Sequence, residues 1–205
     1  DPAKKLVLFT PPSDTYLKHD PITPVVLRAL ESVGAQVLVR KALVGEIDLG
    51  SYRLKPAMVI DEPARSPDFT EVHLDPAADR HLADSIFHSD VVITWASTMI
   101  IDAAVFGKPI VLVGFDAAPR PYAKSIRQYY DYDHQRRIIE MGGVRLTGSP
   151  EELSRVVRAY LENPELDRPL RERLVAAYCG ELDGRAGERL GTYLLEKLRI
   201  EEKEK

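Results

Sequence analysis

Two short apolar segments dominate the sequence pattern, Asp90–Thr94 (DVVIT) and Ile110–Phe115 (IVLVGF). A segment of helical length, Ser97–Phe106, separates them, and Gly107 followed by Pro109 marks its end. Strands that are apolar at nearly every position are buried on both faces, and a helix between two of them forms the crossover of a parallel pair. The chain is therefore restricted to α/β folds in which helices cover both faces of a mostly parallel sheet.

An earlier segment repeats this order of elements. Lys5–Thr10 (KLVLFT) and Ala35–Arg40 (AQVLVR) read as strands, and between them Thr23 is expected to cap a helix that begins with Pro24 and ends at Gly34. The remaining pattern predicts strands at Ala57–Ile60, Thr70–Leu74 and Val144–Thr147. Helices are predicted at Pro76–Ser89 and, after a capping box at Ser149–Glu152, from Pro150 to about Leu161. The segment 165–205 is predicted to be helical, with a break near 180–187 and a charged tail. We interpret residues 1–205 as a single Rossmann-like domain.

Composition excludes several classes of protein. The 205 residues carry 28 Lys+Arg against 32 Asp+Glu, a net charge of −4, so no broad cationic surface is expected to bind nucleic acid. Cys179 is the single cysteine and cannot form an internal disulfide, which favours a reducing, cytoplasmic location. No apolar stretch reaches the length of a membrane span, and the first residues do not resemble a signal peptide. The start without Met indicates a domain cut from a longer chain.

Several well-known motifs are missing. The first strand is not followed by G-x-G-x-x-G, and neither a P-loop nor a G-x-S-x-G elbow occurs, which argues against dehydrogenases, P-loop NTPases and α/β-hydrolases. The five histidines have no zinc-ligand spacing, and we interpret Asp131 and Asp133 as part of a solvated loop. We therefore expect no metal and no cofactor.

The loop after Asp90–Thr94 carries the main candidate site. Ligands of open α/β sheets bind beyond the carboxyl ends of the strands, and here Ser97 and Thr98 place two hydroxyls beside the free N–H groups of a helix start. This arrangement attracts a phosphate, although N-capping alone would also account for it. Asp102, one turn later on the same face, can accept hydrogen bonds from sugar hydroxyls or merely favour the helix start. Trp95 either supports a base or belongs to the core.

Basic residues near two other strand ends are candidates for contacts with a diphosphate. Arg40 ends the second strand and Lys41 follows it, while Arg120, Lys124 and Arg127 follow the strand Ile110–Phe115. Each of them can equally be an ordinary surface charge.

The run Ser89–Asp102 (SDVVITWASTMIID), together with Gly107–Ile110 (GKPI) and Phe115-Asp116, resembles the donor-nucleotide half of GT-B glycosyltransferases. It is most similar to the CDP-glycerol glycerophosphotransferase group, which has I-T-D-Y-S-S-x-x-x-D, then K-P-I, then an aromatic-rich segment that ends in Y-x-D. Tyr122 and Tyr130–Asp133 correspond to the aromatic segment, and Asp183–Arg189 (DGRAGER) resembles the group's D-G-x-A-S-E-R. The likeness covers residues 84 to 195 or so.

The resemblance implies roles for particular residues. Ser97 and Thr98 would contact the pyrophosphate of a UDP-sugar or CDP-polyol donor, Asp102 a donor hydroxyl, and Arg40 the phosphates. It also implies metal-independent transfer of a glycosyl or polyol-phosphate group. The acceptor-binding N-terminal domain would lie outside this chain, so the chain alone would bind donor but turn over poorly. Trp95-Ala96 stands where the group has Asp-Tyr, which bears on the identity of the donor more than on the fold.

Two other interpretations stay open at the level of sequence. A UDP-sugar epimerase-like domain would need carboxylates and a histidine in its cleft, and no convincing set can be assigned. Alternatively, a non-catalytic module would use Trp95 and the tyrosine-rich segment as an apolar contact surface.

Overall fold

The computed structural model describes residues 3–13, 17, 21–63 and 75–203. Its centre is a parallel six-stranded sheet with the order β3-β2-β1-β4-β5-β6. The strands are β1 (Leu6–Phe9), β2 (Gln36–Arg40), β3 (Met58–Asp61), β4 (Val91–Thr94), β5 (Ile110–Val113) and β6 (Arg145–Thr147). The predicted α/β class with a mostly parallel sheet is thus confirmed, while the strand predicted at Thr70–Leu74 lies outside the described residues.

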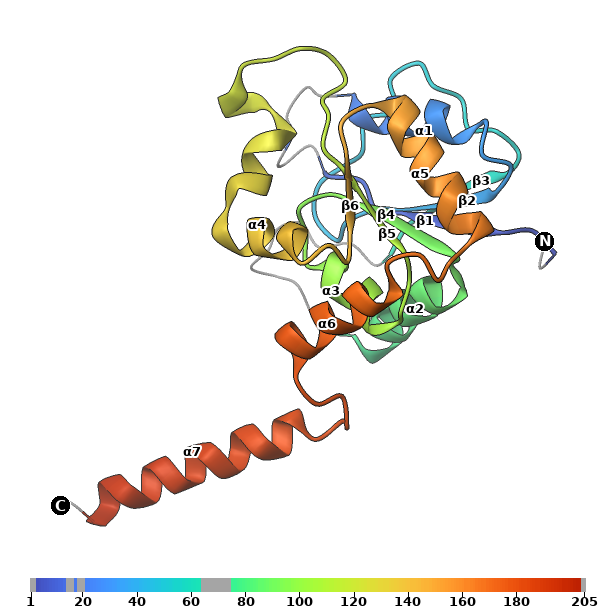
Figure 1. The fold of residues 1–205 in the computed structure, drawn as a ribbon. Coiled ribbons are helices and arrows are strands. Elements are labelled where there is room, and N and C mark those ends of the chain that lie inside the picture. The colour runs from blue at the N-terminus through green and yellow to red at the C-terminus, as the bar shows by residue number, and fades with distance from the viewer. Residues whose placement is uncertain (1–2, 14–16, 18–20, 64–74, 204–205) are drawn as a thin grey trace.

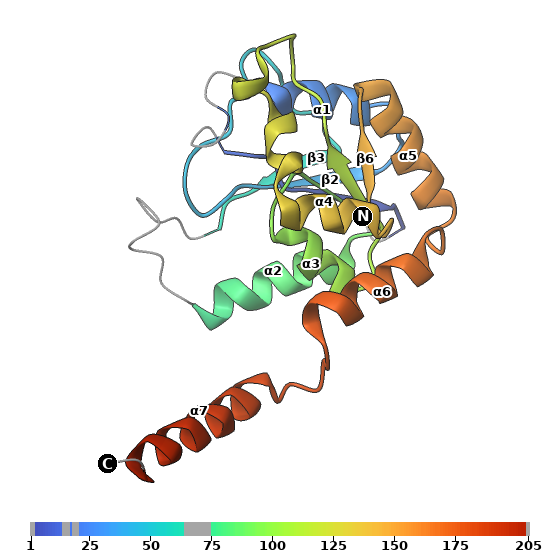
Figure 2. The same cartoon turned by 60° about the vertical axis from the view of Figure 1, so that its left-hand side comes forward.

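Helices cover both faces of the sheet, as Figures 1 and 2 show. On one face α1 packs against α5, and on the other α3 packs against α6 beside α2. The helices are α1 (Ile22–Leu30), α2 (Pro76–His88), α3 (Met99–Val105), α4 (Asp133–Glu140), α5 (Pro150–Glu162), α6 (Arg168–Cys179) and α7 (Ala186–Lys203), with two 3₁₀ helices, η1 (Tyr122–Lys124) and η2 (Ile126–Asp131). Because helices lie on both faces of the sheet, every residue of β4 and β5 is buried.

Capping chemistry decides where two of these helices begin. As predicted, Ser149 caps α5: its Oγ accepts from the N–H of Glu152 at 3.2 Å, and the Glu152 carboxylate reaches back to the N–H of Gly148 at 2.8 Å. The prediction of Thr23 as a cap is wrong. Helix α1 begins at Ile22 after Pro21, without a side-chain cap, and Thr23 is buried in its first turn.

Candidate functional site

The strand order reverses between β1 and β4. From β1 the chain proceeds outward to β2 and β3, and it then returns to β4, β5 and β6 on the other side of β1. The segments that follow β1 and β4 lead to helices on opposite faces of the sheet, because α1 packs against α5 and α3 packs against α6. Open α/β sheets bind ligands at such a point.

Three hydroxyls line up across this point. The Oγ1 of Thr10, directly after β1, donates to the Oγ1 of Thr94 at 2.8 Å. The Thr94 Oγ1 in turn lies 3.0 Å from the Oγ of Ser97. When each hydroxyl donates to the next, the O–H of Ser97 is left to donate to an acceptor outside the chain. Thr94 is fully buried and Ser97 only half-buried, so the row leads from the sheet to the surface.

The start of α3 offers further donors. Thr98 occupies the N-cap position, has helical backbone angles (φ −64°, ψ −18°) and makes no side-chain capping bond. The N–H of Ser97 is used by the carbonyl of Trp95 at 2.7 Å, but within the described residues the N–H groups of Thr98 and Met99 donate to nothing. The alternative that these hydroxyls serve only as caps is therefore not what the structure shows. The corner combines two free N–H groups with an exposed and a half-buried hydroxyl.

Asp102 lies one turn beyond Thr98 on the same face of α3. The N–H of Asp102 bonds to the Thr98 carbonyl at 3.4 Å, and its exposed carboxylate has no hydrogen bond or ion pair with any described residue. Neighbouring protein atoms displace part of its water and raise its pKa above the ordinary value of 3.8. Carboxylates that are partly desolvated and have no partner occur often in binding sites.

Trp95 belongs to the core. It is 9% exposed and its ring meets the ring of Tyr129 edge to face, with centroids 5.3 Å apart. Tyr129 contacts Tyr132 in the same manner at 6.1 Å. The tryptophan therefore joins the loop after β4 to the tyrosine-rich segment.

Arg40 is not free to move toward a ligand. Its side chain is buried at the end of β2, and its Nη1 forms an ion pair with Oδ2 of Asp61 at the end of β3. The other carboxylate oxygen of Asp61 bonds to Nε2 of His81 at 2.8 Å. The arginine thus joins β2, β3 and α2, and a contact between Arg40 and phosphate would require Asp61 to release it.

In the segment after β5, two carboxylates accept hydrogen bonds from other residues of the same segment. Asp116 accepts from the Oγ of Ser125 at 2.6 Å and from the N–H of Ile126 at 2.8 Å, which folds the chain back into η2. Tyr122 is exposed and donates to the carboxylate of Asp131, and this hydrogen bond raises the pKa of the Tyr122 phenol. Lys124 is exposed on η1. Among the described residues, neither Tyr122 nor Lys124 forms a hydrogen bond with Ser97 or Thr98.

A cavity of 690 Å³ opens at the same carboxyl edge, beside the ends of β5 and β6. Its volume is within the range of small-molecule sites. Neither Ser97 nor Thr98 lines it. The lining consists of Gly114–Pro119, Arg127 and Leu146–Gly148, so Arg127 is the one basic residue in this lining.

Sequence reasoning missed Thr10 and Thr94 as members of the site. Both were assigned to strands, where a threonine at the last position is common and carries no functional signal. A usable signal exists, because KLVLFT and DVVIT end in the same residue and neighbouring parallel strands bring their ends together.

No group of three or more His, Cys, Asp or Glu side chains in the described part of the chain is arranged to hold a metal ion. Among the helices described, none has both the length and the apolar character needed to cross a membrane.

No protein-family model and no curated protein sequence matches this chain. Solved structures do match. A putative UDP-N-acetylglucosamine 2-epimerase from Listeria monocytogenes aligns over 96% of this chain and 46% of its own, with a TM-score of 0.55 and 18% identity. The calicheamicin glycosyltransferase CalG4 aligns over 94% and 43% (TM-score 0.55, 16% identity), and the wall teichoic acid polymerase TagF over 98% and 45% (TM-score 0.52, 13% identity).

These similarities confirm the fold. The chain has the Rossmann-like α/β fold found in glycosyltransferases and epimerases of the GT-B type, with a helical C-terminal segment. It spans less than half the length of each of these structures. At such low identities the likeness does not distinguish the CDP-glycerol group from the others.

Proposed function

We propose that this chain is the donor-binding half of a GT-B transferase and that it grips the diphosphate of a nucleotide donor at the start of α3. The observation that carries the proposal is the set of unused donors at the strand-order reversal. This set consists of the N–H groups of Thr98 and Met99 and the hydroxyls of Ser97 and Thr98, which all belong to the start of α3. A diphosphate offers several anionic acceptors at close spacing, and hydrogen bonds to charged acceptors are among the strongest in proteins.

The same donors would assist the reaction. When the glycosyl or polyol-phosphate group departs, negative charge develops on the nucleoside diphosphate, and N–H and O–H groups already oriented toward it stabilise that charge. Asp102, one turn further along α3, would accept from a hydroxyl of the donor. Binding of the phosphates needs no metal in this proposal.

Two observations bear on the donor's base and on the group that is transferred. The resemblance in Ser89–Asp102 favours a CDP-polyol, and the similarity to a putative UDP-N-acetylglucosamine 2-epimerase favours a UDP-sugar. Of the basic residues considered from sequence, Arg127 is the one that lines the cavity at the carboxyl edge. We propose that the cavity receives the transferred group and that Tyr122 and Lys124, which lie on η1 outside this lining, contact the donor. We assign Arg40 to the support of β2 and β3 instead.

A second candidate function is epimerisation of a UDP-sugar. The structural match to an epimerase favours it, since that enzyme shares the fold over 96% of this chain. Binding of UDP alone does not separate the two functions. Formation of an epimerised sugar without an acceptor would support the epimerase, whereas transfer would require an added acceptor.

The proposal is tested by titrating the chain with UDP, CDP and GDP in a calorimeter, in buffer with Mg²⁺ and again with EDTA. We expect one nucleoside diphosphate to bind, with the same Kd in both buffers. The combined variant Ser97→Ala and Thr98→Ala should weaken that binding by about 100-fold, because each hydrogen bond to a charged group contributes roughly 1.5–3 kcal/mol and the two are not fully additive.

A matched control is Thr192→Ala on α7, which removes an exposed hydroxyl far along the chain and should leave the Kd unchanged. Unchanged binding by the Ser97 and Thr98 variant would show that the phosphates lie elsewhere. No binding of any nucleotide would favour the non-catalytic module.

A further inference from the structure

A second cavity lies at the amino edge of the sheet, the edge opposite the proposed donor site. Its volume is 720 Å³, which is enough for a small organic ligand. The cavity opens between α3 and α6, which pack side by side (Figures 1 and 2), and its wall includes the residues just before β4 and β5. Ser97 and Thr98, which follow β4, do not line it. The cavity is therefore separate from the donor site.

Much of the cavity wall is apolar. Val105 and Phe106 at the end of α3 contribute to it, together with Pro109 before β5 and Val175 of α6. Val105 is 39% exposed and Phe106 38%, so these two side chains are only partly covered by the protein. A ligand with an apolar body would remove this surface from water, which favours its binding.

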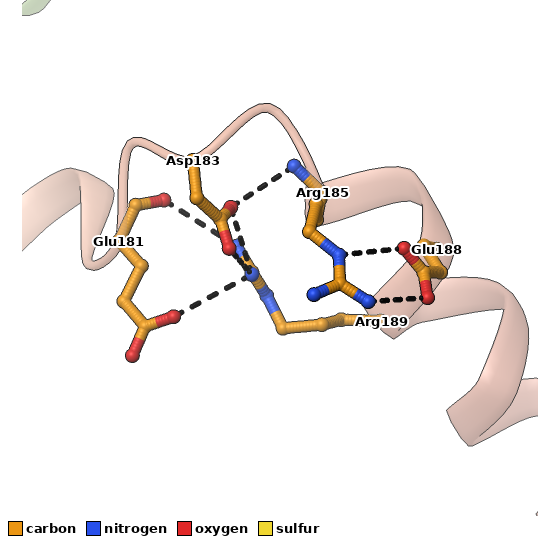
Figure 3. Close-up of polar contacts among 5 residues, drawn as sticks. All are labelled: Glu181, Asp183, Arg185, Glu188 and Arg189. Atoms are coloured by element: carbon orange, nitrogen blue, oxygen red, sulfur yellow. Dashed lines mark hydrogen bonds and ion pairs between the residues drawn. The ribbon is translucent and has the colours of Figure 1, made fainter.

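The turn after α6 forms one side of the cavity with Leu182. Side-chain contacts of the neighbouring residues fix this turn (Figure 3). Arg189 donates from Nη1 to both carboxylate oxygens of Asp183, at 2.9 and 2.8 Å, and from Nη2 to the carbonyl of Glu181 at 3.3 Å. Asp183 also accepts from the N–H of Arg185 at 2.9 Å. Leu182 lies between two residues that both contact Arg189, so this part of the wall is held in place.

Every carboxylate of the cavity wall already has a cation. Asp90 pairs with Nζ of Lys5 at 2.9 Å. Glu165 and Glu172 pair with the guanidinium of Arg168, at 2.7 and 3.1 Å. The wall contains two further cations, so together with Lys5 it carries four cations against three carboxylates, an excess of one positive charge. This excess favours a ligand with a single negative charge.

Lys108 is the first of the two further cations. It is half-buried, and its Nζ donates to the carbonyl of Phe87 at 2.6 Å and lies 5.6 Å from the centre of the Phe87 ring. An ammonium group has three N–H donors, so two of them have no acceptor among the described residues. Burial lowers the pKa of Lys108 despite the nearby carboxylate of Asp90. An anion in the cavity would supply both the missing acceptor and the missing charge.

Arg171 is the second cation, and only 1% of it is exposed. Its Nη1 and Nη2 donate to the backbone carbonyls of Leu166 and Pro164, and its buried Nε has no acceptor among the described residues. Burial lowers the pKa of Arg171, so the carboxylates of Asp167 and Glu165 do not offset the loss of water around it. A buried cation without a bound anion is unfavourable, and a negative charge in the cavity would reduce that cost.

We propose that this cavity binds a medium-chain carboxylate, an apolar chain that ends in one anionic group. The carboxylate would accept hydrogen bonds from Nζ of Lys108 and lie in the field of Arg171. The apolar chain would pack on Val105, Phe106 and Val175. This inference does not depend on the proposed function, because the two sites lie at opposite edges of the sheet.

The test is a calorimetric titration of the chain with octanoate and with 1-octanol, a neutral molecule of the same length. We expect octanoate to bind at one site and at least about tenfold more tightly than 1-octanol, because hydrogen bonds to charged acceptors are stronger. Lys108→Met keeps the length of the side chain but removes its charge, and it should abolish this preference. Lys197→Met is the matched control: it removes an exposed lysine that also lies over an aromatic ring, on α7, and should leave both affinities unchanged.

A second variant tests the position of the apolar chain. Ala176 lines the cavity from an exposed position on α6, so Ala176→Trp should narrow the cavity without disturbing the core and should weaken the binding of both molecules. Equal affinity for octanoate and 1-octanol, or no binding of octanoate, would overturn the proposal. Octanoate binding that survives Lys108→Met and Ala176→Trp, or that UDP displaces, would place the ligand elsewhere and would also overturn it.

Discussion

Replacement of Thr94 by valine tests the row of hydroxyls across the strand-order reversal. Valine keeps the shape of threonine but cannot bond to Thr10 or Ser97, so the variant loses contacts of 2.8 and 3.0 Å. Thr94 is fully buried and water cannot replace its hydroxyl. Ser97 and Thr10 are both half-buried, and without Thr94 the Thr10 hydroxyl keeps a long contact of 3.4 Å to the carbonyl of Ile93.

The expected cost follows from these contacts. Leaving a fully buried polar group unpaired costs about 1–3 kcal/mol, which is the upper bound for the half-buried hydroxyls of Thr10 and Ser97. A domain of this size loses roughly 2–4 °C in Tm for each kcal/mol, so Thr94→Val should melt about 2–12 °C lower. Donor affinity should fall more weakly than in the Ser97 and Thr98 variant, because the donors remain but Ser97 loses its orientation.

Thermal unfolding by circular dichroism and calorimetric titration with UDP measure the two effects. Thr98→Ala is the matched control: its hydroxyl has no partner among the described residues, so Tm should stay unchanged while affinity falls. A Thr94→Val protein with the Tm and Kd of the natural sequence would refute the reasoning about the hydroxyl row.

Three further predictions concern single residues. Asp61→Asn should lower stability by about 3–5 kcal/mol, seen in urea unfolding, because it leaves the buried Arg40 without its anion; an unchanged midpoint would contradict the structural role of this pair. The raised pKa of Asp102 means that the folded chain holds this proton to higher pH than the unfolded chain does, so the native protein loses stability as pH rises above about 4. At pH 7, Asp102→Asn should therefore have a free energy of unfolding higher than that of the natural chain by a few tenths of a kcal/mol at this exposed position, and at pH 3 the two should be equal. The variant should also bind donor less tightly. A loss of stability at pH 7 would contradict this. Ser149→Ala should remove the cap on the N–H of Glu152 and cost about 1 kcal/mol in thermal unfolding with no change in donor affinity, which any loss of UDP binding would contradict.

Much of the fold follows from local patterns in the sequence. The runs DVVIT and IVLVGF are apolar enough to require burial on both faces, and both become central strands. Ser149 and Glu152 set the start of α5 because both partners of the capping box are within four residues of each other. The start of α1 was misplaced because tertiary burial of Thr23 outweighs its preference for a cap position.

The candidate site was only partly predictable. Ser97, Thr98 and Asp102 could be proposed from the sequence because their spacing on one helix start is a local property. The partnership of Thr10 with Thr94 spans 84 positions and depends on which strands become neighbours. The same reason explains Arg40: its anion, Asp61, is 21 positions away at the end of another strand, and nothing in the sequence near Arg40 reveals that pair.

A crystal structure of the chain with bound UDP tests the central claim most directly. We expect oxygens of the β-phosphate within hydrogen-bond distance of the Thr98 and Met99 N–H groups and the Ser97 hydroxyl, about 2.7–3.2 Å away. A nucleotide bound elsewhere, with those groups facing solvent, would contradict the account.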